Sequence, residues 1–299
     1  MAVLLLFLDG VGLGELDPAW NPWVAGRTPT LQRLLGGPLA GPERVERDDV
    51  LLVPTDATLG MAGLPQSGTG QTALLTGLNA AALVGRHVTA YPTAPLRALL
   101  LEHSLFVRLA AAGRRVALAN AYTEDYHQAV SARRLRHGAI TIAAIGAGVR
   151  LRTVADLRRA QAVFHDLTNA RLRAWGYDLP LRTPFQAGRH LAHLAAEYDF
   201  TLFEFFLTDL AAHGRVEVSP VAVVELVDEM LAGITAALPA EVTLVVSSDH
   251  GNIEDGRTRV HTANPVPTLV LGPARRHFRE VAALTDIAPA VLRSMGVEV

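Results

Sequence analysis

Acidic and histidine side chains in this sequence stand next to apolar runs that we expect to form buried strands. The residues are Asp9, Asp209, His213, Asp249, His250 and His261. Taken singly, each has an ordinary alternative role as a turn acid, a helix-surface Asp–His pair or a structural histidine. Ligands bind parallel α/β sheets beyond the carboxyl ends of the strands. We therefore expect all six side chains to gather at one edge of a sheet.

Three carboxylates and three imidazoles at one edge predict a site for cations. Several acids in one crevice are costly unless cations neutralise them. Six such ligands suffice for two ions with three protein ligands each, which leaves open positions for a substrate. Imidazole and carboxylate ligands without thiolates favour Zn²⁺ or Mn²⁺ over Mg²⁺ or Ca²⁺. We predict two divalent ions, Mn²⁺ or Zn²⁺, as cofactors.

A candidate nucleophile lies in "PQSGTGQTALLTG", residues 65–77. Ser67 precedes an apolar helical run, and backbone N–H groups at a helix N-terminus favour a phosphate. The same position also suits an ordinary N-cap serine. No histidine lies nearby in the sequence, and Pro65 stands where a G-x-S-x-G elbow has its first glycine. Ser67 would therefore need a metal ion to activate it.

The composition excludes several other chemistries. The 299-residue chain has no cysteine and no lysine, which excludes thiol nucleophiles, thiolate zinc sites, a P-loop and Schiff-base catalysis. A formal net charge of −2 gives no electrostatic footprint for nucleic acid. The apolar N-terminal run is short and lacks a basic leader, and no stretch is long enough to span a membrane. We expect a soluble cytoplasmic protein without nucleic-acid or membrane partners, and its oligomeric state stays open.

The pattern of apolar runs predicts the fold class. Strand-like runs at 3–7, 114–120, 199–206, 242–248 and 267–272 alternate with segments of helical periodicity. This alternation predicts an α/β fold with a mostly parallel sheet sandwiched by helices. Residues 122–183 are rich in arginine and break the rhythm, so we expect a small inserted lid there and a core of 1–121 and 184–299. Residues 85–103 could join the lid, and Arg86 and Arg97 are candidates to bind a second anionic group of the substrate.

The order of the candidate residues resembles that of the alkaline phosphatase superfamily. Within it, "SSDHGNIED" and "HTANPVP" resemble the metalloenzyme-domain branch of cofactor-independent phosphoglycerate mutase and phosphopentomutase. The resemblance covers residues 1 to about 120 and about 184 to the end. It implies an alkaline-phosphatase-like sheet and Ser67 as the nucleophile that forms a phosphoserine. It also implies two metal sites, of which one is Asp209, His213 and His261, and the other is Asp9, Asp249 and His250 with the Ser67 oxygen.

The chain also departs from those mutases. Gln71 stands where they have a histidine, no lysine is present to lie near the metals, and the insertion is much shorter than theirs. We therefore predict a phosphotransferase or phosphomonoesterase for a small phosphorylated metabolite, with a phosphosugar or phosphoglycerate mutase as the alternative. An alternative of another class is a catalytically silent binding or regulatory protein, although all seven positions carry competent residue types. Sulfatase chemistry is disfavoured because Ser67 is followed by Gly-Thr-Gly-Gln and not by the x-Pro-x-Arg of a sulfatase. A dinucleotide-binding loop is disfavoured because Glu15 stands where such a loop has its third glycine.

Overall fold

The computed structural model describes residues 1–47 and 49–299 and contains one large sheet. Its strand order is β2-β3-β9-β8-β1-β7-β4. The strands are β1 (Ala2–Leu8), β2 (Val45–Glu46), β3 (Val50–Thr55), β4 (Val116–Leu118), β7 (Phe200–Phe205), β8 (Val242–Ser247) and β9 (Val266–Leu271). Strands β8, β1, β7 and β4 pair in parallel, and the β2–β3, β3–β9 and β9–β8 pairs are antiparallel. The predicted α/β fold with a mostly parallel sheet is confirmed.

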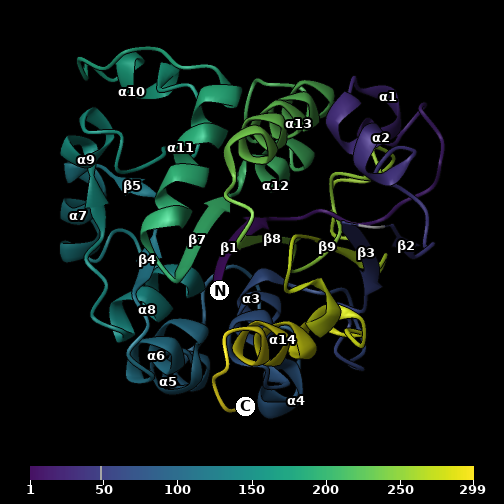
Figure 1. The fold of residues 1–299 in the computed structure, drawn as a ribbon, viewed down its shortest axis with the longest axis horizontal. Helices are drawn as coiled ribbons and strands as arrows, with labels where there is room; N and C mark the ends of the chain where they lie inside the picture. Colours follow the sequence, from purple (N-terminus) through teal and green to yellow (C-terminus); the bar gives the residue numbers. More distant parts are fainter. Residues whose placement is uncertain (48) are drawn as a thin grey trace.

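Helices cover both faces of the sheet because both faces are apolar. In β1, Val3, Leu5 and Phe7 belong to one buried cluster, and the alternate residues belong to another. On the face of Phe7 lie α3 (Ser67–Thr76), α4 (Ala80–Val84), α5 (Ala94–His103), α6 (Leu105–Ala111), α8 (Ala139–Gly146) and α14 (Ile287–Ser294). On the other face lie α1 (Pro22–Ala25), α2 (Pro29–Leu35), α11 (Pro184–Glu197), α12 (Leu207–Ala212) and α13 (Pro220–Ala237). Figure 1 shows these two helical layers below and above the sheet.

The antiparallel strand β9 decides where the C-terminal loop ends. Because β9 runs opposite to β8, its first residue lies at the edge where β8 ends. The loop 248–265 therefore leaves and re-enters the sheet at the same edge, and it is closed by a bridge between Gly251 and Thr262. The sequence did not reveal this direction, because an apolar run of six residues looks the same in either orientation. Strand β3, "VLLVPT", was also not predicted.

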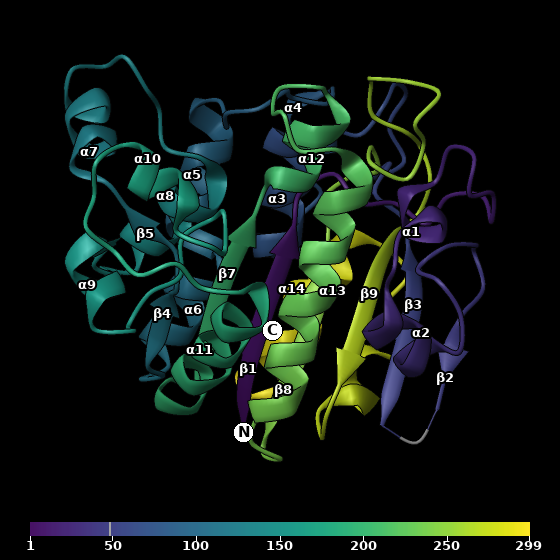
Figure 2. The ribbon, with the colours of Figure 1, turned by 90° about the horizontal axis from the view of Figure 1, so that it is seen from above.

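The segment 122–183 is divided between the core and a smaller cluster. Helix α8 is buried among α3, α5 and α6 in the main core. The elements β5 (Ala121–Tyr122), α7 (Glu124–Ser131), α9 (Val154–Arg158) and α10 (Ala170–Ala174) lie at one side of the sheet, as Figure 2 shows, and β6 (Arg152–Thr153) pairs with β5. An apolar cluster around Leu157 and Leu172 is separate from the main core. The boundaries of the predicted lid stay a prediction.

Two short 3₁₀ helices, η1 (Arg275–Phe278) and η2 (Leu284–Asp286), complete the elements. Among the described residues, no helix has both the length and the apolar character that crossing a bilayer requires. A cytoplasmic location stays a prediction.

Candidate metal centre

All six predicted ligand residues lie at the carboxyl edge of the parallel strands. Asp9 follows β1, Asp209 lies in α12 directly after β7, and Asp249 follows β8. Gly10 makes the turn after β1 with a φ of +67°, and a Cβ atom there would lie 2.8 Å from Asp209 Oδ1. Only glycine combines this conformation with so close an approach. The turn thus lets the first two acids come together.

One predicted group of ligands consists of Asp209, His213 and His261. The Nε2 atoms of the two histidines lie 3.3 Å apart, and Asp209 Oδ1 lies 3.3 Å from the first and 3.7 Å from the second. Both Nδ1 atoms face carbonyl oxygens, those of Arg259 at 2.7 Å and Pro65 at 2.8 Å. Because a carbonyl only accepts, each Nδ1 carries a proton, and the neutral form of each ring presents an Nε2 lone pair. Three acceptors that converge in this way fit a bound cation.

The second group consists of Asp9, Asp249 and His250. His250 Nε2 lies 3.4 Å from Asp9 Oδ1 and 3.5 Å from Asp249 Oδ2. Burial and the neighbouring carboxylate raise the pKa of Asp9 well above its usual range, and burial raises the pKa of Asp249 to about 6. Burial also lowers the pKa of His250 to about 3. Asp9 Oδ1 is buried without a hydrogen-bond donor among the described residues. A divalent cation would supply the missing partner and favour both carboxylates.

The two groups are in direct contact through their imidazoles. The rings of His250 and His261 stack with centroids 3.6 Å apart and planes 12° apart. Ligand atoms of Asp209, His250 and His261 also lie within 4.8 Å of one another, so His250 borders both groups. The division of the ligands between two ions therefore stays a prediction.

Ser67 begins helix α3 beside the second group. Its Oγ lies 3.0 Å from His250 Nε2, and its side chain is partly exposed. Helix α3 approaches closely because Gly70 has no side chain, and a Cβ atom there would lie 2.6 Å from the carbonyl oxygen of Asp249. The N–H groups of the first helical turn have no partner inside a helix. They lie beside Ser67 and favour an anion there.

Two amide side chains bind the carboxylates of the centre. Gln71 Nε2 lies 3.3 Å from Asp9 Oδ2 and 3.1 Å from Asp249 Oδ2, and it donates to both. Asn252 Nδ2 donates to Asp209 Oδ1 at 2.7 Å. Sequence reasoning noted Gln71 only as a departure and assigned no role to Asn252. The signal was available, since Asn252 lies inside the "SSDHGNIED" stretch.

Glu254 is a further buried acid that sequence reasoning missed. Its carboxylate accepts hydrogen bonds from the backbone N–H groups of Gly12 and Asn252 at 2.8 Å, from Asn264 Nδ2 at 3.0 Å and from the hydroxyl of Thr262. These donors come from the loops after β1 and β8 and before β9. Glu254 thus holds together the loops that carry the ligands.

The two arginines proposed for the substrate lie on the surface. Arg86 follows α4, Arg97 lies on α5, and both are exposed. Neither side chain makes a hydrogen bond to the part of the chain that the structure describes, so their role stays a prediction.

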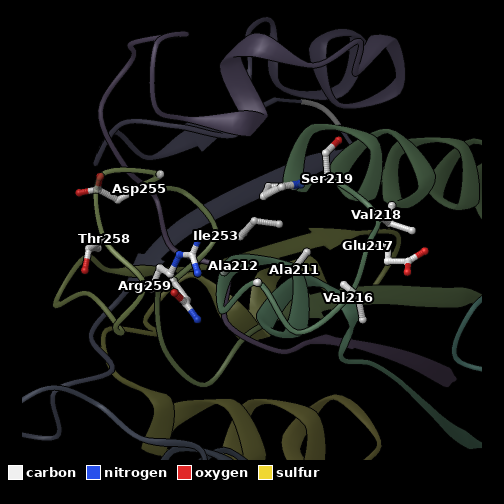
Figure 3. A pocket seen from close by; sticks show the side chains of 14 residues that line it. Ala211, Ala212, Val216, Glu217, Val218, Ser219, Ile253, Asp255, Thr258 and Arg259 are labelled. Atoms are coloured by element: carbon white, nitrogen blue, oxygen red, sulfur yellow. The ribbon is translucent and has the colours of Figure 1, made fainter.

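Figure 3 shows a small cavity of about 280 Å³ that borders the first ligand group. Asp255, Thr258 and Arg259 line one side, and Glu217 and Ser219 line the other. The cavity adjoins the centre because Arg259, which lines it, accepts the hydrogen bond from His213 Nδ1 through its carbonyl oxygen.

A mostly parallel sheet with buried acids and imidazoles at its carboxyl edge defines the class of an α/β metalloenzyme. The model of the Metalloenzyme superfamily matches residues 1–299, and the chain belongs to this superfamily. The resemblance seen in the sequence and the prediction of a metal-dependent enzyme are both confirmed.

The relatives are mutases that are much longer than this chain. The 2,3-bisphosphoglycerate-independent phosphoglycerate mutase of Thermomicrobium roseum is 36% identical over 119 residues, which are 36% of this chain and 23% of the mutase. The mutase of the same name from Syntrophotalea carbinolica is 33% identical over 112 residues, 35% of this chain and 22% of the mutase. The alignments thus span less than a quarter of either relative.

Solved structures share the fold. The alkaline phosphatase of the Antarctic bacterium TAB5 aligns with a TM-score of 0.54 at 13% identity, over 99% of this chain and 98% of the phosphatase. The Leishmania mexicana phosphoglycerate mutase aligns with a TM-score of 0.52 at 14% identity, over 100% of this chain and 96% of the mutase. At this identity, the likeness shows the fold alone.

Proposed function

We propose that this chain is a two-metal phosphoryl-transfer enzyme that acts on a small phosphorylated metabolite through Ser67. The observation that carries the proposal is the position of Ser67 Oγ, 3.0 Å from His250 Nε2 at the N-terminus of a helix and beside converging carboxylates and imidazoles. The phosphoglycerate mutases that resemble this chain support the reaction class.

The ligand residues would hold two ions in the division that the resemblance implies. Asp209, His213 and His261 would bind one, and Asp9, Asp249 and His250 would bind the other, with Mn²⁺ or Zn²⁺ as the metal. When bound, such ions neutralise charge on the phosphoryl oxygens and activate the attacking oxygen.

The remaining work falls to side chains and backbone of this chain. Ser67 Oγ gives up its proton to water and attacks phosphorus. The bond from phosphorus to the ester oxygen breaks, and that oxygen takes up a proton from water and leaves as an alcohol. The free N–H groups of the first turn of α3 donate to the phosphoryl oxygens. Gln71 holds the carboxylates of Asp9 and Asp249 in place. The phosphoserine then passes its phosphoryl group to water or to an acceptor hydroxyl.

We favour a phosphomonoesterase over a mutase. A mutase must keep water out while its intermediate re-orients, which requires a closing lid. The segment 122–183 is short, and part of it, α8, is fixed in the core. Incubation with a panel of phosphosugars, and with 3-phosphoglycerate, separates the two activities: free phosphate indicates hydrolysis and an isomeric ester indicates a mutase.

The Ser67→Ala variant tests the proposal. The Mn²⁺-loaded protein, quenched in acid after incubation with a ³²P-labelled ester, is expected to retain label on Ser67. The variant is expected to retain none and to lose at least about 10³-fold in kcat. Ser131→Ala, at an exposed position of α7, is the matched control.

Equal labelling of the wild type and Ser67→Ala would overturn the role of Ser67. Metal binding by a wild type that never acquires label or releases phosphate would favour the silent binding protein.

A further inference from the structure

A cavity with aromatic walls lies next to the metal centre. It has a volume of about 720 Å³ and opens at the carboxyl ends of β7 and β4. Glu204 of β7 and Asn120, which follows β4, lie in its lining. Tyr126 of α7, Phe206 and Trp175 also line it.

The register of the sheet places Glu204 near Asp9 of the metal centre. Glu204 pairs with Phe7 across β7 and β1, and Asp9 lies two residues further along. With strands about 4.8 Å apart and a rise of about 3.3 Å per residue, the Cα atoms of Glu204 and Asp9 are about 8 Å apart. The alternation of β7 puts Glu204 on the same face as Phe7, which is the face that α3 covers. A Cα separation of about 8 Å is within the length of a small phosphate ester.

The carboxyl group of Glu204 has no partner. Its side chain makes no hydrogen bond to any residue that the structure describes. Its backbone is fixed, because Asn120 Oδ1 accepts from Glu204 N at 2.8 Å and Asn120 Nδ2 donates to Glu204 O at 2.8 Å. Burial, followed by the charge of Asp249, raises the pKa of Glu204 to about 7. A rigidly held acid without a partner is complementary to a cation.

The walls around this acid are aromatic. Tyr122 ends β5 and Tyr126 lies on α7, and the centroids of their rings are 4.7 Å apart. The rings of His165 and Phe206 stack with centroids 4.4 Å apart. Burial lowers the pKa of His165 to about 3, so this ring is neutral at physiological pH. Aromatic faces attract organic cations. The other charged lining residues, Asp125 and Arg136, are exposed at the rim.

We propose that this cavity holds the organic part of the substrate and that Glu204 selects a protonated amine on it. The substrate class is then a small phosphorylated amine. A substrate whose organic part carries a carboxylate, such as phosphoglycerate, would bring that group towards Glu204 and be disfavoured. The assignment of the substrate class rests on the proposed phosphoryl-transfer function.

The test compares Mn²⁺-loaded wild type and Glu204→Gln on O-phosphoethanolamine and on its neutral analogue ethyl phosphate. Wild type is expected to show a kcat/KM for the amine at least about tenfold higher. Glu204→Gln is expected to remove that preference, so that the ratio of kcat/KM on the two esters falls to about one. Glu102→Gln, on the exposed surface of α5, is the matched control. The same preference in Glu204→Gln, or none in wild type, would overturn the inference.

A binding measurement separates this inference from the proposed function. Ethanolamine alone is titrated into the Mn²⁺-loaded protein by calorimetry. Binding to wild type that is lost in Glu204→Gln supports the cavity assignment even if Ser67 never acquires label. If no ester of the panel is turned over and ethanolamine does not bind to wild type, both proposals fail. Label on Ser67 with no amine preference refutes the cavity assignment alone.

Discussion

Metal binding and thermal stability are linked through the facing histidines, and His213→Ala is the perturbation that tests this link. In the chelated wild type, the Nε2 atoms of His213 and His261 face each other at 3.3 Å with no proton donor between them. Removing one ring eliminates this contact and the hydrogen bond to Arg259 O. Loss of the close contact between the two nitrogens favours the folded state, whereas loss of the hydrogen bond disfavours it. We therefore expect the free energy of unfolding of the chelated protein to change by at most about 1 kcal/mol.

The metal-loaded proteins should differ much more. At a free Mn²⁺ concentration one hundred times Kd, one site stabilises the folded state by about 2.7 kcal/mol. For a chain of 299 residues, an unfolding entropy of about 2.1 cal/mol/K per residue makes this a rise in Tm of about 4 °C per site. With both sites filled, the Tm of wild type should rise by about 8 °C. The Tm of His213→Ala should rise by at least one site's share, about 4 °C, less than this.

The assay is scanning calorimetry in EDTA and then with increasing free Mn²⁺ or Zn²⁺, together with elemental analysis after dialysis. His193→Ala is the matched control, because His193 lies exposed on α11, on the opposite face of the sheet from α3. The Tm of His193→Ala should rise with metal by as much as that of wild type. If His213→Ala gained as much Tm as wild type, or if wild type gained none, the cation assignment of the first ligand group would be wrong.

Two further predictions concern buried acids outside the ligand set. In Glu254→Gln, four donors lose their anionic acceptor. We therefore expect the free energy of unfolding in urea to fall by about 2 kcal/mol and the Kd for Mn²⁺ to rise 10- to 100-fold. Glu241→Gln, at an exposed position, is the control, and an unchanged Kd in Glu254→Gln would contradict the role of Glu254 in holding the loops together. Asp156 accepts from Arg150 and Arg159, which hold its pKa well below the usual range. Because the folded pKa is lowered, this stabilisation is present above the unfolded pKa of about 4 and is lost as the pH falls below it. Asp156→Asn should lower the free energy of unfolding in urea by about 3 kcal/mol at pH 7, and its difference from wild type should shrink towards pH 2. Asp178→Asn, at an exposed position, is the control. A difference that does not depend on pH would show that the stabilisation does not come from the charge of Asp156.

The sequence alone was enough to predict the sheet and which acidic and imidazole side chains gather at its carboxyl edge. Five of the seven strands are marked by apolar runs, and polar groups cluster where those runs end. Side chains after parallel strands must meet at one edge, so Asp9, Asp209 and Asp249 were expected together before any coordinates. The short strand β2 and the strand β3 were not predicted, because the flanking Pro-rich and charged residues around "VLLVPT" obscure the pattern.

The sequence by itself determined which residue types are available and near which strand ends they stand, since both follow from local patterns of two to eleven residues. Only the tertiary structure decided their contacts: the reversed direction of β9 that brings His261 to the edge, the Gln71 amide between two acids, and Glu204 without a partner in an aromatic cavity. Each of these depends on packing between segments far apart in the chain. Periodicity reports which face a residue takes in its own element, and it carries no information about the element packed against that face.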